Sequence, residues 1–173
     1  MSELNPPQGA FQVTRAGGAS GALLARNLTA LNQLAQRYVP GAPKISVVDF
    51  HLASGHGSVI VMATATGDQS FSGIGQLVVV YGLTGNEAWL RDLMAVEGAA
   101  HKEILRELVI ALVLAAGRRE SITKLRAEIS STQAALTEVL HQLGFRIELR
   151  GTDTIIVSLD LQQFEPPQNG TRA

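Results

Sequence analysis

The sequence contains no cysteine, few aromatic residues and no apolar run long enough to cross a membrane. Without cysteine there is no disulfide framework, thiol nucleophile or cysteine-based metal site. The strongest apolar run, residues 108–116, has about half of the roughly 20 residues that a transmembrane helix requires, and it predicts a core helix instead. The first residues lack the basic and apolar regions of a secretory signal, so we expect a cytoplasmic protein without a membrane partner.

Charge is scarce as well. Only 17% of the residues are charged, and the net charge is -1. Proteins that bind nucleic acids or anionic membranes need clustered Lys and Arg, so we expect neither partner. The chain has 173 residues, of which 46% are hydrophobic, and this suffices for the core of one globular domain. Small molecules or proteins are therefore the expected partners.

The pattern of apolar residues and turn formers predicts a single α/β domain at 10–161, between loose polar tails at 1–9 and 162–173. Residues 44–54 fit either a short helix or a strand. With a helix there, the order is β-α-α-β-β-β-α-β-α-β-β. The expected elements are a strand at 10–15, a helix at about 20–38, strands at 58–66, 71–81 and 87–95, a helix at 99–116, a strand at 122–129, a helix that Ser130 or Ser131 caps and that ends at 143, and a hairpin of 146–150 with 154–161.

Two stretches within this order carry a more specific pattern. The strand from Ala88 reads Ala-Trp-Leu-Arg-Asp-Leu-Met-Ala-Val, and the helix before Phe145 ends Val-Leu-His-Gln-Leu-Gly-Phe. They resemble the GNAT superfamily of N-acetyltransferases, whose members typically read Ala-Trp-Ile-Glu-Asp-Val-Val-Val and Ala-x-x-Leu-Tyr-x-x-Leu-Gly-Phe. The resemblance covers about 58–161. It implies a mixed, mostly antiparallel sheet flanked by helices, N-acetyltransferase activity on an amine of a small molecule or protein, and acetyl-CoA as cofactor.

The loop after that strand departs from the family pattern. In the family it reads Arg-Gly-Lys-Gly-Ile-Gly, and its glycines let backbone N–H groups approach the pyrophosphate at a helix N-terminus. In this chain the six positions hold Ala100, His101, Lys102, Glu103, Ile104 and Leu105. Glu103 adds a negative charge, and two unit charges at about 4 Å repel by ~1 to 4 kcal/mol. Lys102 offsets part of this. Glu103 also has an explanation unrelated to a cofactor, because an acidic residue in the first turn stabilises any helix. We expect acetyl-CoA to bind weakly or not at all.

The resemblance also implies the position of the remaining site. In the family the matching strand separates from the strand at 122–129, and the pantetheine arm binds backbone exposed in the gap, which here corresponds to Met94, Ala95 and Val96. An ordinary core strand accounts for these three residues equally well. A carboxylate of the same strand often serves as general base, which makes Asp92 and Glu97 the candidates.

The general acid of the family is usually a tyrosine, and that position holds Leu140. The two tyrosines, Tyr38 and Tyr81, fit apolar core positions better than catalytic ones. His51 and His56 flank a short loop, but no acidic or cysteine partner completes a ligand set, so no metal site is expected.

Three functions remain open at this point. The first is a divergent acyl-CoA-dependent N-acetyltransferase with Asp92 as base. The second is a GNAT-fold pseudoenzyme that has lost acetyl-CoA and acts as a binding or interaction module, for example as a homodimer. The third is a winged-helix DNA-binding unit at 121–161. Its recognition helix at 130–143 contains no Arg or Lys, which base readout and phosphate contacts normally require.

Overall fold

The structure is a computed structural model that describes residues 11–15, 19–38, 58–82, 85–119 and 121–165. Seven strands form one sheet in the order β1-β2-β3-β4-β5-β7-β6. The elements are β1 (Phe11–Arg15), α1 (Ala19–Tyr38), β2 (Val59–Ala65), β3 (Phe71–Gly82), β4 (Gly85–Ala95), α3 (His101–Gly117), β5 (Ile122–Ser130), α4 (Ala134–Gln142), β6 (Arg146–Arg150), β7 (Thr154–Asp160) and a short 3-10 helix η1 (Leu161–Gln163).

All neighbouring strands pair antiparallel except β4 and β5, which are parallel. The parallel pair exists because α3 carries the chain from the end of β4 back to the start of β5. The predicted mixed, mostly antiparallel sheet is therefore confirmed, and β3 pairs antiparallel with β4. The alternative winged helix is wrong, because β5 pairs with β4 as part of the same sheet.

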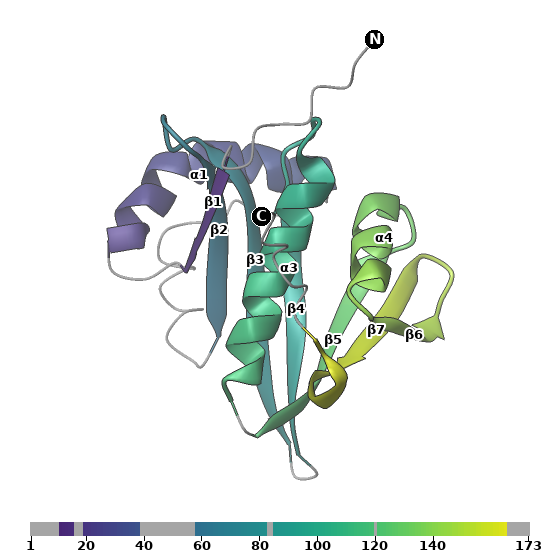
Figure 1. Ribbon diagram of the computed structural model, residues 1–173. Helices are drawn as coiled ribbons and strands as arrows, with labels where there is room; N and C mark the ends of the chain where they lie inside the picture. The colour runs from purple at the N-terminus through teal and green to yellow at the C-terminus, as the bar shows by residue number, and fades with distance from the viewer. Residues whose placement is uncertain (1–10, 16–18, 39–57, 83–84, 120, 166–173) are drawn as a thin grey trace, which may run out of the picture.

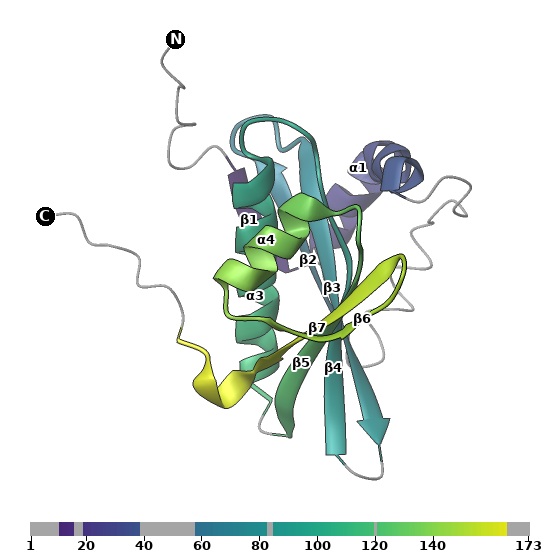
Figure 2. The same cartoon turned by 90° about the vertical axis from the view of Figure 1, so that its right-hand side faces the viewer.

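Helices cover both faces of the sheet (Figures 1 and 2). On one face, α3 and α4 bury a large core that includes Leu108, Leu112, Leu125 and Leu140, none of which is exposed. On the other face, α1 packs Leu31 and Leu34 against β2, β3 and the end of β4. Leu28 of the same helix is partly buried against this second cluster. None of the helices that the structure describes is both long and apolar enough to span a membrane.

The structure differs from the sequence predictions at three places. The predicted serine cap is wrong: Ser130 ends β5 opposite Thr154, and α4 begins only at Ala134 without a side-chain cap. Tyr81, expected in the core, is 70% exposed on β3. The chain stays against the domain beyond residue 161, since Phe164 packs partly buried on the core. Residues 44–54 lie outside the described residues.

Candidate functional site

A β-bulge in β4 determines which way the side chains of this strand point. Ile74 on β3 faces Met94, but Gln76 faces Arg91, so two residues of β4, Asp92 and Leu93, lie opposite the single residue between them. Asp92 adopts a positive φ of 51°, which is uncommon outside glycine. Before the bulge the even-numbered residues of β4 face α3, and after it the odd-numbered ones do. Met94 consequently packs with α1 rather than α3.

Gly75 is the residue opposite the bulge, and it makes the arrangement possible. A Cβ atom at this position would lie 2.8 Å from Leu93 Cδ2 and 2.9 Å from Leu112 Cδ1. Both contacts are shorter than real Cβ atoms tolerate. The absence of a side chain at Gly75 therefore leaves room for Leu93 to turn onto the α3 face.

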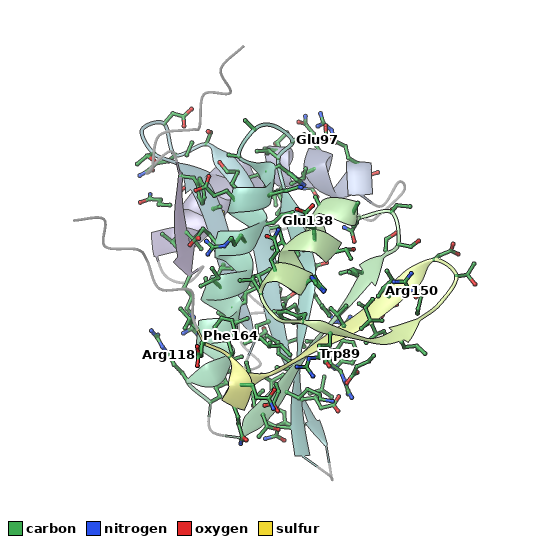
Figure 3. All side chains as sticks on the ribbon, turned by 45° about the vertical axis from the view of Figure 1, so that its right-hand side comes forward. Trp89, Glu97, Arg118, Glu138, Arg150 and Phe164 are labelled. Atoms are coloured by element: carbon green, nitrogen blue, oxygen red, sulfur yellow. The ribbon has the colours of Figure 1, made fainter. Side chains whose placement is uncertain are left out.

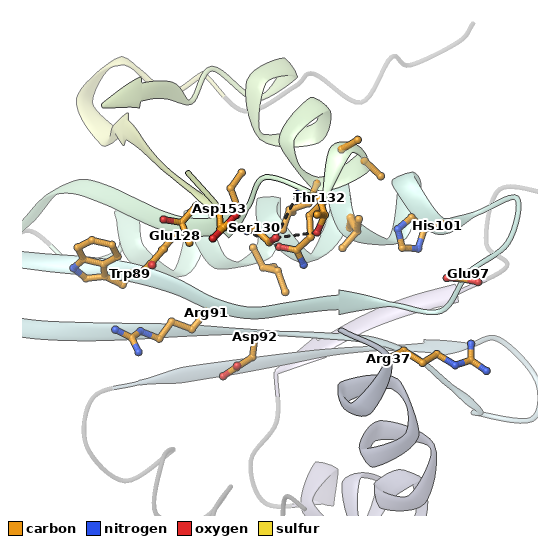
Figure 4. A pocket seen from close by; sticks show the side chains of 18 residues that line it. Arg37, Trp89, Arg91, Asp92, Glu97, His101, Glu128, Ser130, Thr132 and Asp153 are labelled. Carbon is orange, nitrogen blue, oxygen red and sulfur yellow. Dashed lines mark hydrogen bonds between the residues drawn. The ribbon is translucent and has the colours of Figure 1, made fainter. Parts of the chain in front are cut away.

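The two parallel strands separate just before the bulge. The last paired residues are Leu90 and Ala127, although β4 continues to Ala95 and β5 to Ser130. A pocket of about 800 Å³ occupies the gap (Figure 4). Its described lining residues are Arg37, Trp89, Arg91, Asp92, Leu93, Glu97, His101, Leu105, Glu128, Ile129, Ser130, Thr132, Gln133, Ala134, Ala135, Leu136, Asp153 and Thr154.

Residues from both faces of the sheet line the pocket. Figure 4 shows the Asp92 carboxylate pointing to the side of α1, whereas His101, Ser130 and Thr132 lie on the opposite side of β4. Ser130 Oγ and Thr132 Oγ1 are hydrogen-bonded at 2.9 Å, which fixes the turn before α4.

Asp92 is a titratable group that lines this pocket on the side of α1. Its side chain keeps contact with solvent, but the surrounding walls desolvate it, and burial raises the pKa of Asp92 above the ordinary aspartate value while Arg91 opposes the rise. A carboxyl group with a raised pKa is a better proton acceptor than an ordinary aspartate once it is ionised. The arrangement suits general base chemistry.

Two side-chain contacts connect the first turn of α3 to neighbouring segments. His101 Nδ1 lies 3.0 Å from the carbonyl oxygen of Val96. A carbonyl only accepts, so Nδ1 carries the proton and Nε2 of the neutral ring is an acceptor. The backbone N–H of Val96 donates to Ser72 at 2.8 Å, so both backbone groups of Val96 have partners. Lys102 Nζ donates to Glu138 on α4 at 2.5 Å.

The sequence-predicted residues fall into two groups. Asp92, Glu97 and His101 line the pocket. The other predicted cofactor residues are not among its described lining: Met94, Ala95 and Ile104 are buried, Val96 is half-buried, and Lys102 and Glu103 are exposed. Among the described residues no cluster of three or more His, Cys, Asp or Glu suitable for a metal exists, and His51 and His56 lie outside the described residues.

Sequence reasoning missed the polar residues that β5 and the hairpin turn contribute. Glu128 alternates with Ala127 and Ile129, which are buried, and this alternation indicates that it lies on the opposite face of β5. Asp153 follows a turn glycine, and no sequence pattern links it to the gap. Arg37 comes from α1, which is distant in sequence and reaches the pocket only through the fold.

The described lining of the pocket is predominantly acidic. Four carboxylates line it, Asp92, Glu97, Glu128 and Asp153, against two arginines, Arg37 and Arg91. The field in such a pocket favours cations over anions.

Comparison with solved structures identifies the fold. The chain superposes on the putative acetyltransferase yncA of Salmonella typhimurium, solved with its cofactor acetyl-CoA, with a TM-score of 0.68 and 16% identity over 92% of this chain and 99% of that one. The ribosomal-protein-S5-alanine acetyltransferase of Vibrio fischeri gives 0.67 and 15%, over 91% and 96%. NAA60 of Arabidopsis thaliana, in complex with a bisubstrate analogue, gives 0.65 and 13%, over 87% and 97%. No family model and no curated protein matches the sequence. The fold is that of the GNAT acetyltransferases.

Proposed function

We propose that the chain is an acyl-CoA-dependent N-acyltransferase with weakened affinity for acetyl-CoA and a cationic amine as its acceptor. The observation that carries the proposal is the separation of β4 from β5 after Leu90 and Ala127. It leaves the end of β4 beside a pocket that reaches both Asp92 and the start of α3. The fold shared with GNAT acetyltransferases supports the same reaction class.

The residues of the gap fit the arm of acetyl-CoA better than its pyrophosphate. After Leu90 none of the strands that the structure describes pairs with the edge of β4 that faces β5, so an extended ligand can lie along this edge. At α3, the helix N-terminus favours an anion, but the His101 ring and the Glu103 charge oppose it. Lys102 is already paired with Glu138. The favourable contacts of the arm and the unfavourable environment of the pyrophosphate together predict a site that binds acetyl-CoA weakly.

Acetyl-CoA, when bound, supplies an acetyl group as a thioester. Asp92 would accept one proton from the acceptor ammonium and so free the nitrogen lone pair for attack on the thioester, and the second proton that the nitrogen loses as the amide forms would go to solvent. The position of the acid in related enzymes holds Leu140, which is buried and carries no proton to give. Solvent water therefore protonates the departing thiolate.

The acidic lining supports a cationic acceptor. An aliphatic amine is an ammonium ion near neutral pH, and Asp92, Glu128 and Asp153 attract it before deprotonation. Trp89 adds an aromatic wall beside these groups, which also favours a cation. We expect a diamine such as cadaverine to be a better acceptor than an amino acid of zero net charge, with the difference in kcat/KM shrinking at high salt.

A thermal-shift titration with acetyl-CoA tests the binding step. A ligand at 100 times its Kd stabilises by about 2.7 kcal/mol, which for a domain of this size raises Tm by about 5 to 10 °C. We expect a smaller rise at millimolar acetyl-CoA. A full rise at micromolar concentration contradicts the weak site, and no rise at any concentration contradicts the enzyme.

The second candidate is an interaction module that has lost acetyl-CoA. The specific observation in its favour is that His101 and Lys102 both make contacts within the chain at the position of the pyrophosphate loop. A variant with glycine at His101 and Glu103 separates the two candidates. A gain in acetyl-CoA affinity over a weakly binding wild type supports the enzyme, and the absence of binding in both the wild type and a folded variant supports the module.

A further inference from the structure

A second hollow lies between α3 and the edge strand β1, at the end of the helix that is remote from the gap. Its volume is about 340 Å³. It shares no lining residue with the first pocket, and Arg118 and Glu97 lie at opposite ends of α3 in Figure 3. The described lining residues are Val13, Thr14, Arg15, Val59, Val61, Ala111, Leu114, Ala115, Arg118 and Arg119.

The floor of this hollow is apolar. Val59 and Val61 of β2 belong to the core beneath α3, and Val13 of β1 packs partly buried beside them. On the helical wall, Leu114 is 44% exposed and extends the apolar surface of the floor. Its neighbour Ala115 is small and leaves open space. An occupant gains free energy by covering this surface with an apolar body.

The rim is basic on both walls. Arg118 and Arg119 follow the end of α3, and Arg15 ends β1 on the opposite wall. The described lining of the hollow contains no acidic side chain. The helix dipole accounts for basic residues at the end of α3, but not for their position at the rim of an apolar hollow. Guanidinium groups bind carboxylates and phosphates in a bidentate manner.

We propose that this hollow binds a single-chain amphiphile with an anionic head group. The apolar chain lies over the valines and Leu114, and the carboxylate or phosphate of the head group pairs with Arg118 and Arg119. The volume is at the lower end of the range of small-molecule pockets, which suits one chain of medium length. The proposal does not depend on the function of the first pocket.

Isothermal calorimetry and a ¹⁵N NMR titration with decanoate test the proposal on the full chain. Decyl phosphate and decanol are the comparison ligands. We expect decanoate to bind, to shift the amide signals of Val13 and Leu114, and to bind at least tenfold more tightly than decanol. Whichever of decanoate and decyl phosphate binds more tightly identifies the preferred head group, and both results support the proposal.

Three variants locate the ligand. Arg118→Gln combined with Arg119→Gln, and separately Leu114→Gln, should each weaken decanoate binding at least tenfold. All three positions are at the surface or only partly buried, so these proteins should fold. Arg150→Gln on β6 removes an exposed arginine outside the hollow and should change nothing. The proposal is overturned by absent binding, by equal binding of decanol, by unchanged binding in both sets of variants, or by shifts confined to Asp92 and its neighbours.

Discussion

The ring of His101 reaches back from the first turn of α3 to the carbonyl oxygen of Val96, 3.0 Å away, and so bridges the loop that follows β4. A glycine at this position makes no such bond and leaves the carbonyl open. The His101 side chain therefore both fills the loop and satisfies the carbonyl oxygen of Val96. Glu103, exposed in the same turn, adds a negative charge near the helix N-terminus.

The first prediction follows from this contact. The double change His101→Gly and Glu103→Gly removes the bridge and one negative charge, and we expect the affinity for CoA to rise at least tenfold. Part of the gain is charge relief, so it should shrink at high salt. Two glycines in the first turns of a helix cost up to about 2 kcal/mol of stability, which most domains tolerate. Calorimetry measures the affinity.

A matched control checks that loosening a helix end is not itself the cause. His141→Gly changes an exposed histidine of α4 that does not line the pocket, and it should leave CoA affinity unchanged. Unaltered affinity in a folded double variant would mean that the pocket has closed elsewhere, and would contradict a pyrophosphate site at this turn.

The second prediction concerns Asp92. If transfer takes place, Asp92→Asn should lower kcat by about 10²-fold or more, as expected for a positioned base, whereas His141→Ala should do little. Because burial raises the pKa of Asp92, the rate should increase with pH through a value above that of ordinary aspartate, and this limb should vanish in Asp92→Asn. Steady-state rates from pH 4 to 9 measure both effects. Equal activity of the variant and the wild type removes Asp92 from the mechanism.

The regular elements were predictable because each rests on a local pattern. The alternation in β5 and the 3.6-residue period in α3 are set by burial on one face, and the structure confirms both. The bulge was not predictable, since nothing in the sequence around Asp92 marks an extra residue. Its only sign lies across the sheet, in Gly73 and Gly75 of β3, and the two become meaningful only once β3 is paired with β4.

The residues of the candidate site also divide into those that a local sequence pattern predicts and those that only the tertiary fold brings together. Asp92 and His101 were found because they belong to the strand and loop that the family resemblance covers. Asp153 and Arg37 were missed because only the pairing of β7 with β5 and the packing of α1 bring them to the gap. The failed serine cap has a similar cause. Ser130 is a residue type that favours a helix N-cap, but in the structure it pairs with Thr154 of β7 as the last residue of β5, so the helix begins later.

The third prediction tests the glycine opposite the bulge. Gly75→Ala introduces a Cβ at 2.8 Å from Leu93 and 2.9 Å from Leu112, which are both buried and cannot move away freely. We expect a loss of about 1 to 3 kcal/mol in the free energy of unfolding. Gly117→Ala is the control, because a Cβ there meets nothing within 4 Å, and it should be neutral or slightly stabilising. Urea denaturation measures both, and equal stability of the two variants contradicts tight packing at Gly75.

The fourth prediction concerns a charged network that holds the strands together just before they separate. Arg126 on β5 donates to Glu87 of β4 at 2.5 Å and to Glu148 of β6 at 2.9 Å, and its guanidinium lies 5.8 Å from the ring centre of Trp89. Lys124 donates to the other oxygen of Glu148 at 2.7 Å. These hydrogen bonds, chiefly that of Lys124, lower the pKa of Glu148 from 4.5 to about 2.

A carboxyl group with a lowered pKa stabilises the folded state above its unfolded pKa, and this stabilisation is lost as pH falls through the folded value. The contribution of Glu148 should therefore be complete above pH 4.5 and disappear towards pH 2. Glu148→Gln should cost about 1 kcal/mol at pH 7, because the pair is partly exposed, and almost nothing at pH 2. Glu165→Gln, at an exposed carboxylate, is the control and should show no such dependence. Thermal melts at several pH values measure the difference, and a cost of Glu148→Gln that is equal at pH 7 and pH 2 would show that the network does not act through the charge of Glu148.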